Sequence, residues 1–292
     1  MQLLVNALIA GSLAALIAGG LAVVYGVLGV FNLALGQLAL IGGYTTWWLY
    51  QVLHLPLGLS IILGLACGAL VTWVTFEIAV RPFFKHHRFL PLVTTIAWSM
   101  ILDGLILLVF EERPRSILPG LKHIYEFSGI RISLEQGLLI LATLVILLSF
   151  AYVFHRTSLG RRIRAVVQHE HAALSLGVPA GLLHGFLFVL SGVFAAAGGI
   201  FIGIDQSLTP TLAFPLTIKA YAAIIAGGKG NLWGAILFAY VIALLEQLLV
   251  GVHWFGAFYV PAGYQQTVAL LFIIVILLIK PAGFFGNSSR TA

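Results

Sequence analysis

Three ionisable side chains stand inside long apolar stretches, where a charge can serve chemistry that a surface charge cannot. Asp103 lies in the run Ser99-Met-Ile-Leu-Asp103-Gly104 without a Lys or Arg at helical spacing, and Lys219 and Glu246 lie in two later apolar runs. A charge within a membrane span is costly, so it marks a substrate or proton path or pairs with an opposite charge. We therefore expect Lys219 and Glu246 to face a bundle interior, to pair with each other, or to snorkel from helix ends.

Uncharged polar residues within or beside apolar runs form a second candidate set. Such side chains commonly form hydrogen bonds between helices, and they can also line a water-accessible path. As a set they suggest a polar conduit through the bundle. We assign to it the uncharged residues Tyr25, Asn32, Gln37, Thr94 and Thr95 and the ionisable residue Asp103.

Motifs of enzymes and metal sites are missing from the sequence. The nine histidines include His86-His87 and His169-Glu170-His171, but neither group has the i,i+4 spacing of a helical zinc site, and Cys67 is the only cysteine. There is no phosphate-binding Gly-x-x-x-x-Gly-Lys-Ser/Thr loop, no Gly-x-Ser-x-Gly elbow and no His-Glu-x-x-His. We expect no enzyme activity, no catalytic residue, no bound metal and no cofactor in this chain, which cannot hydrolyse ATP by itself.

The elements that must position these residues are membrane-spanning helices. Of the 292 residues, 61% are hydrophobic and 8% are charged, against roughly 25% charged in globular domains. The first charged residue is Glu77. The net charge of +6 therefore bears on membrane topology rather than on nucleic-acid binding.

The predicted fold is all-α, a polytopic bundle of eight to nine spans, some of them discontinuous. The segment at 216–227 is short for a hydrocarbon core of about 30 Å, so we expect it to be tilted, broken or re-entrant. The nine expected spans lie near residues 3–30, 33–53, 57–80, 89–110, 134–154, 183–204, 216–227, 231–250 and 264–280.

The placement of Lys and Arg predicts the orientation. Alternating spans put ten of the 15 basic residues on one side, in the loops 81–88 and 155–182, at Lys229 and in the C-terminal tail. Because basic residues collect in cytoplasmic loops, the N-terminus is predicted outside and the C-terminus in the cytoplasm.

Two glycine-rich breaks each run into an asparagine, at Gly26 to Asn32 and at Gly227 to Asn231. Discontinuous helices at such positions point to a translocation site, because freed backbone groups are tolerated in a membrane only beside protein or water. Glycines used for close helix packing are the alternative interpretation.

The stretch 155–182 is the most informative polar segment. Ala165, Ala172, Ala173 and Leu176 can share a small apolar helix face, and Gly177 and then Pro179 end the helix. A short cytoplasmic helix is therefore predicted. It either seats in a groove on a soluble partner or lies on anionic lipid.

The sequence resembles the membrane permeases of branched-chain amino acid ABC importers, specifically the shorter, H-type subunit. The likeness runs over nearly the whole chain, and its order and spacing are more specific than any one piece. The matching residues are Tyr25-Gly26-Val27 and Asn32 through Gly36 to Gly42-Gly43-Tyr44; Glu77 and Arg81-Pro82; Thr94-Thr95-Ile96; Thr157 to Gly177; Lys219-Ala220; Gly227 to Gly230 with Gly234-Ala235; Glu246; and Lys280-Pro281 with Gly283 and Gly286.

The resemblance implies a complex in the bacterial inner membrane, with a second permease subunit, two cytosolic ATPases that bind ATP and Mg, and an extracytoplasmic substrate-binding protein. Residues 1–292 would form one permease domain, with an extracytoplasmic loop at 111–133 and a coupling segment at 155–182. The residues assigned to ATPase coupling are Arg161, Arg162, Arg164, Ala172, Ala173 and Gly177.

Departures from the family pattern leave the substrate open. The family usually has His where Leu35 stands and an acidic residue where Gln37 stands, and it has a glycine pair near Phe238-Ala239. Branched-chain amino acids, other neutral amino acids, amides and urea are all compatible substrates. The alternative function is a self-sufficient secondary carrier that couples to protons through Asp103 or Glu246.

Overall fold

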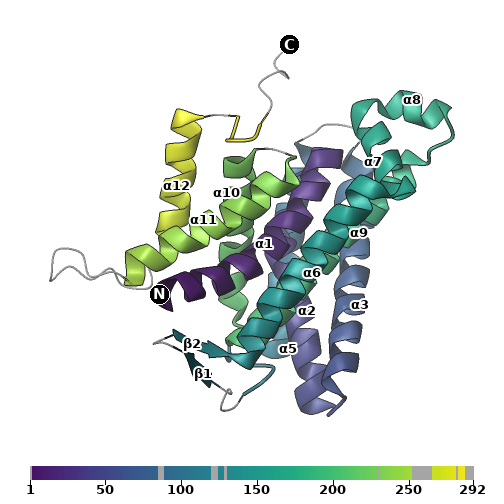
Figure 1. The fold of residues 1–292 in the computed structure, drawn as a ribbon. Helices are drawn as coiled ribbons and strands as arrows, with labels where there is room; N and C mark the ends of the chain where they lie inside the picture. Colours follow the sequence, from purple (N-terminus) through teal and green to yellow (C-terminus); the bar gives the residue numbers. More distant parts are fainter. Residues whose placement is uncertain are drawn as a thin grey trace.

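The computed structural model describes residues 2–84, 89–119, 124–127, 130–228, 230–251, 265–280 and 282–286. Within these ranges the chain is a helical bundle with one small hairpin (Figure 1). Its elements are α1 (Gln2–Leu28), α2 (Leu35–Trp47), the π-helical turn η1 (Trp48–Val52), α3 (Leu57–Thr75), the π-helical turn η2 (Phe76–Val80), α4 (Arg81–Phe84), α5 (Leu90–Phe110), β1 (Ile124–Phe127), β2 (Ile130–Ser133), α6 (Leu134–Arg156), α7 (Ser158–Gln168), α8 (Glu170–Ser175), α9 (Ala180–Asp205), the 3-10 turn η3 (Pro210–Leu212), α10 (Ala213–Gly227), α11 (Leu232–Gly251) and α12 (Gln265–Ile279).

The expected all-α bundle is confirmed, and each of the nine predicted spans coincides with a helix. Seven helical segments in the described part of the chain are long and apolar enough to cross a membrane. They correspond to α1, α3 continued through α4, α5, α6, α9, α10 and α11. The seventh predicted span is longer than expected, because η3 extends α10 backward to give an 18-residue segment, Pro210–Gly227. Since α2 and α12 are shorter, the total of eight to nine spans stays a prediction.

Helices α1 and α9 form the centre of the bundle. In an apolar stretch of 18 residues from each of these two helices, 83% of the residues are buried. In the equivalent stretches of the segments that contain α3 and α5, 22% are buried. Small residues on the central helices allow backbones to approach closely. At Gly199 of α9, an added Cβ would overlap the carbonyl of Ala39 in α2. The core therefore depends on backbone contact as well as on large side chains.

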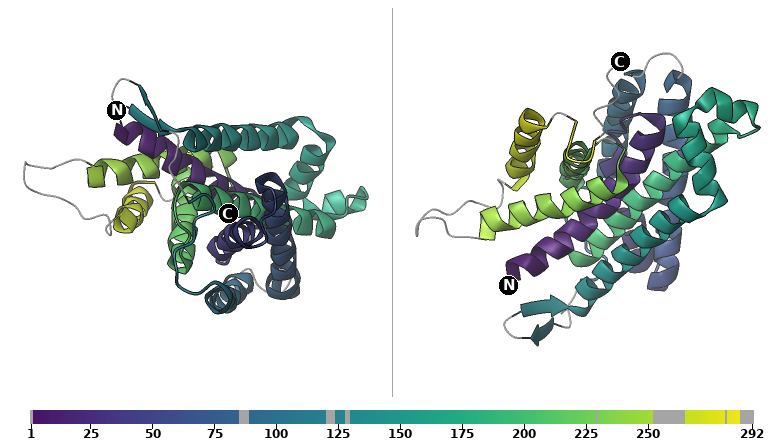
Figure 2. Two further views of the ribbon diagram at one scale, coloured as in Figure 1. Left: turned by 90° about the horizontal axis from the view of Figure 1, so that it is seen from below. Right: turned by 45° about the horizontal axis from the view of Figure 1, so that its top comes forward.

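The two ends of the bundle carry different structures. The N-terminus and the β1–β2 hairpin lie at one end, and α7, α8 and the described C-terminal residues lie at the other (Figures 1 and 2). The hairpin pairs Ile124 with Ser133 and Phe127 with Ile130 in antiparallel register. The sequence predicts only a loop at 111–133, so the hairpin is a feature that the structure adds.

Candidate functional site

A helix break inside the bundle is the first candidate site. Between α1 and α2 the chain leaves the helical conformation over residues 29–34, yet Val30, Asn32 and Ala34 of this break are buried. Gly29 begins it with φ 65°, a left-handed conformation that glycine adopts without a steric penalty. The ring of Phe31 lies 5.5 Å from that of Tyr221 in α10. The break therefore runs beside a candidate span rather than across a surface.

The two glycine-rich breaks seen in the sequence meet in space. An added Cβ on Gly26, near the end of α1, would lie 3.1 Å from Cα of Gly230, between α10 and α11. Asparagine side chains order both segments, since Asn32 Oδ1 accepts from the Ala34 N–H and Asn231 Oδ1 accepts from the Gly234 N–H, each at 3.1 Å. The glycines thus pack closely and also flank a discontinuity, and a translocation site at this place stays a prediction.

Side chains from α5 and α10 satisfy the backbone of the break. Thr95 Oγ1 accepts from the Leu33 N–H at 3.3 Å, and it lies 3.3 Å from the Phe31 carbonyl, to which it can donate. Thr217 Oγ1 accepts from the Gly36 N–H at 2.9 Å, where α2 begins. Non-helical backbone is tolerated in a membrane only with such partners or with water. Thr217 and Phe31 were not among the predicted path residues, although Thr217 stands two positions before Lys219.

Gln37 and Asp103, both predicted path residues, are in direct contact. Gln37 Nε2 donates to Asp103 Oδ2 at 3.0 Å. Gln37 is 2% exposed, whereas Asp103 is only partly buried, and an added Cβ at the neighbouring Gly104 would meet no atom within 4 Å. The carboxylate is thus held on one side by α2 and is open on the other.

Buried polar atoms without a partner gather along the break and α2. Among the described residues, Asn32 Nδ2, Gln37 Oε1 and Tyr44 Oη form no hydrogen bond. Gln37 and Tyr44 are seven residues apart, so they share a face of α2, and the Tyr44 ring stacks on Phe110 of α5 at 4.6 Å. Unpaired buried polar groups are rare in native proteins and mark sites where water or a ligand supplies the partner.

The remaining predicted path residues divide into two groups. Tyr25 joins the break, since its ring lies 4.6 Å from that of Phe31. Thr94 points elsewhere, because its hydroxyl donates to the Ala79 carbonyl in η2 at 2.5 Å. The structure therefore brings together Tyr25, Asn32, Thr95, Gln37 and Asp103 along one strip, and it leaves Thr94 outside that strip.

A buried ion pair joins α10 to α11. Lys219 Nζ lies 2.8 Å from Glu246 Oε2, and Glu246 is 4% exposed. Of the three expectations for these residues, mutual pairing is the observed one. The pair lines a cavity of about 90 Å³ between α1, α9, α10 and α11. Glu246 Oε1 has no partner among the described residues.

The projecting helix pair α7–α8 is the second candidate site. The single helix expected from the sequence is two helices, because His169 takes an extended conformation between them. Gly160 lets α7 pack against the end of α6, where a Cβ would overlap the Phe154 carbonyl. Arg164 donates to the same carbonyl at 2.5 Å. These contacts fix the direction in which α7 leaves the bundle.

The residues assigned to coupling have different environments in α7 and α8. Ala173 is buried with Val166 and Ala180, whereas Ala172 is exposed. Gly177 follows the end of α8 with φ 81°, as the helix-stop signal predicted. Leu176, the residue before it, is 82% exposed. Arg161 and Arg162 are also exposed. Ala172, Leu176 and these two arginines are thus available to a partner. Arg164 instead ties α7 to α6, and Ala173 packs α8 against α7 and α9.

Possible metal ligands do not converge in the described part of the chain. No group of three His, Cys, Asp or Glu side chains there is placed to hold an ion. His169 and His171 are exposed near α8, and His86-His87 fall outside the described residues.

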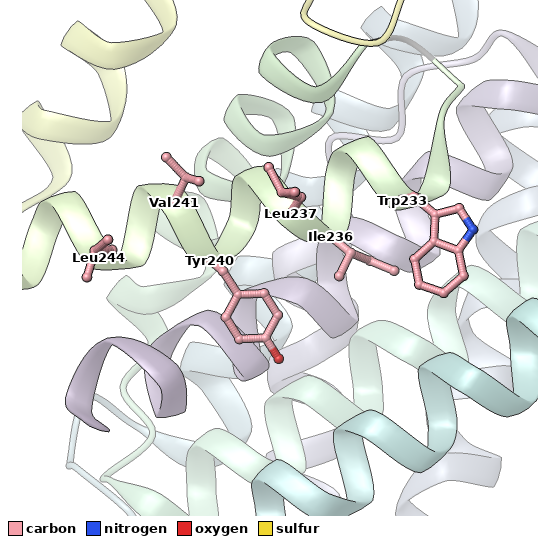
Figure 3. A pocket seen from close by; sticks show the side chains of 6 residues that line it. All are labelled: Trp233, Ile236, Leu237, Tyr240, Val241 and Leu244. Atoms are coloured by element: carbon pink, nitrogen blue, oxygen red, sulfur yellow. The ribbon is translucent and has the colours of Figure 1, made fainter. Parts of the chain in front are cut away.

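An apolar groove runs along the outer face of α11 (Figure 3). Its volume is about 430 Å³, and one helix supplies its lining. The Tyr240 hydroxyl is used internally, since it lies 3.0 Å from Ser12 Oγ of α1. The lining residues are Trp233, Ile236, Leu237, Tyr240, Val241 and Leu244. The groove is therefore almost wholly apolar, and the indole N–H of Trp233 is a hydrogen-bond donor in its lining.

The chain is similar to known proteins over a range that includes both candidate sites. The family model described as "Branched-chain amino acid transport system / permease component" matches residues 3–279. The high-affinity branched-chain amino acid transport system permease protein BraD of Pseudomonas aeruginosa is 29% identical over 98% of this chain and 96% of its own. LivH of Escherichia coli is 26% identical over the same shares, and the probable LivH of Methanocaldococcus jannaschii is 27% identical over 98% and 92%.

A solved structure has a similar fold. The structure titled "PsaBC from Streptococcus pneumoniae in complex with Fab" has a TM-score of 0.52 and 17% identity, and it covers 98% of this chain and 94% of that chain. The likeness at this identity concerns the fold alone. The family match, however, spans the helix break and α7–α8 together, so the chain belongs to the family of branched-chain amino acid transport system permease components.

Proposed function

We propose that this chain is the permease subunit of an ATP-driven ABC importer for branched-chain or other small neutral amino acids. One observation carries the proposal: the family match over residues 3–279 includes the polar helix break and the α7–α8 projection. The complete importer would add a second permease subunit, identical or paralogous, two cytosolic ATPases that bind ATP and Mg, and an extracytoplasmic substrate-binding protein. The chain itself would carry no enzyme activity, in keeping with relatives that are described as transport permeases.

The strip formed by the break, α2 and α5 would line the translocation path. Asn32, Gln37 and Asp103 supply buried or half-buried polar atoms there. Thr95 and Thr217 hold the non-helical backbone in place by hydrogen bonds from two other helices. A backbone held by side chains can change partners when the helices move, so the break is also a hinge at which the path could open and close.

The α7–α8 end of the bundle would face the cytoplasm. This end carries the exposed Arg161 and Arg162, and the N-terminus lies at the opposite end (Figure 1). An excess of Lys and Arg on one side marks the cytoplasmic face. The protein would then sit in the plasma membrane, which is the inner membrane in bacteria, as one permease domain with its N-terminus outside and its C-terminus inside. Residues 155–182 would couple to the ATPases, and residues 111–133 would face the binding protein.

Reconstitution tests this function against the proton-coupled carrier. We expect the chain with its permease and ATPase partners and its binding protein to accumulate leucine in proteoliposomes only with ATP and Mg. The chain alone should be inert, with or without a pH gradient. ATP-independent uptake driven by a pH gradient in liposomes that hold this chain alone would contradict the proposal and favour the carrier.

A further inference from the structure

Asp103 is an acidic group in the middle of a candidate span, and the residues that the structure describes place no cation beside it. It lies in α5, within Leu90–Phe110. In the described part of the chain, no Lys, Arg or His lies within ion-pair distance of its carboxylate. Lys219, in the candidate span of α10, is paired with Glu246 at 2.8 Å. None of the described residues therefore compensates the negative charge of Asp103.

The open side of Asp103 cannot face lipid at an acceptable cost. A carboxylate in a membrane span faces the bundle interior or a water-filled cavity, because transfer of the charge to hydrocarbon is expensive. Asp103 is half-buried, and space is open beside Gly104. Ser99, one turn earlier, lies on the same flank of α5. We conclude that this flank borders the path or a partner subunit.

Two hydrogen-bond acceptors at this place have unused capacity, the Asp103 carboxylate and the Gln37 amide oxygen. Asp103 accepts one hydrogen bond, from Gln37 Nε2 at 3.0 Å. Gln37 Oε1, the oxygen of the same amide, is buried and has no donor among the described residues. An ammonium ion has three donors and no acceptor, so it complements a carboxylate beside an amide oxygen. An amide or urea NH₂ group can donate as well, but it brings no positive charge.

We propose that Asp103, held in position by Gln37, binds the ammonium group of the transported substrate. This inference rests on the proposed function and assigns a residue that favours zwitterionic amino acids over uncharged amides and urea. The site needs no high affinity, because a permease must release what it binds. Its role is to lower the cost of moving a positive charge past the apolar faces of α2 and α5.

The test compares Asp103→Asn with Asp103→Glu in the complete importer. Asn keeps the shape and can still accept from Gln37, but it removes the charge. We expect leucine uptake with Asn to fall at least about tenfold, as for loss of one charge-assisted hydrogen bond, and with Glu to remain within a few-fold of wild type. Ser99→Ala is the matched control on the same flank, and its uptake should be unchanged because the Ser99 hydroxyl donates to Ile96 of its own helix.

A second readout separates recognition from structure. Saturation-transfer NMR on the permease–ATPase complex without binding protein should detect L-leucine with wild type and not with Asp103→Asn, while 4-methylpentanoate, which lacks the ammonium, should give the same weak signal with both. Assembly of each variant is checked by co-purification of the ATPases. Equal leucine uptake and equal leucine signal in the assembled Asn variant would overturn the inference. Failure of the wild-type importer to transport any amino acid would instead overturn the proposed function.

Discussion

Replacement of Lys219 by methionine is expected to destabilise the assembled permease by about 3–5 kcal/mol. The change leaves the Glu246 carboxylate 4% exposed, with neither of its oxygens bonded to a described side chain once the 2.8 Å contact is gone. A buried charge without a partner is far costlier than the intact pair is stabilising. The measurement is thermal or denaturant unfolding of the purified complex in detergent.

Two comparisons make this prediction specific to the buried pair. The double variant Lys219→Met/Glu246→Leu removes both charges and should recover most of the lost stability, since apolar replacements of buried pairs are often neutral. Arg81→Met is the matched control, because Arg81 and Glu77 form an exposed i,i+4 pair at 2.7 Å, which is worth at most about 1 kcal/mol. Equal losses for Lys219→Met and Arg81→Met would show that the pair does not carry the α10–α11 contact.

Replacement of Ala172 by tryptophan is expected to abolish most substrate-stimulated ATPase activity, with a loss of at least about tenfold, or 1.4 kcal/mol of coupling free energy. Ala172 is exposed on α8, so the ring would occupy the surface on which a partner must seat and would disturb little inside the chain. The choice of residue matters. Ala173 is buried and Gly177 has φ 81°, so bulky changes there would distort the helix pair itself.

Ala97→Trp provides the control for Ala172→Trp. Ala97 is also exposed and helical, but it lies in α5, inside a candidate span. We expect this variant to keep its stimulated ATPase activity and both variants to insert into the membrane at wild-type levels. Full substrate-stimulated ATPase activity in the Ala172→Trp variant, with the ATPases bound, would show that α8 is not part of the coupling surface.

Apolar length and charge placement made the helices predictable. A span of about 20 apolar residues is visible in one sequence, and each predicted span coincides with a helix. The ends were less predictable, because they depend on neighbours. The helical segment starts at Pro210, with η3 and then α10, and it packs beside α2. The apolar run 216–227 alone does not predict this contact.

Local sequence patterns gave wrong secondary structure at two places where tertiary contacts determine the conformation. The helical spacing of the small residues predicts one helix across the α7–α8 stretch, but the extended backbone at His169 divides it into two. The hairpin of β1 and β2 was missed because its strands, Ile124–Phe127 and Ile130–Ser133, are only four residues long. Short strands of this length are hard to tell from loop in a chain dominated by helices.

The residues of the candidate site could be predicted from the sequence, but the contacts between them could not. Residue type alone marked Asp103 and Gln37, and the cost of polar groups in a span made them candidates. Their mutual hydrogen bond joins residues 66 positions apart, a separation over which helical spacing predicts nothing. Thr217 was missed for the same reason, since only the position of the break gives its hydroxyl a backbone partner at Gly36.

The side of the membrane on which α8 lies tests the central claim most directly. Because Cys67 is the only cysteine, the variant Cys67→Ala/Ala172→Cys carries one thiol, on the exposed face of α8. A membrane-impermeant maleimide should label it in inside-out vesicles and not in intact cells, and bound ATPase should protect it. Labelling in intact cells would place α8 outside the cytoplasm and would contradict the claim that ATPases drive this permease through α8.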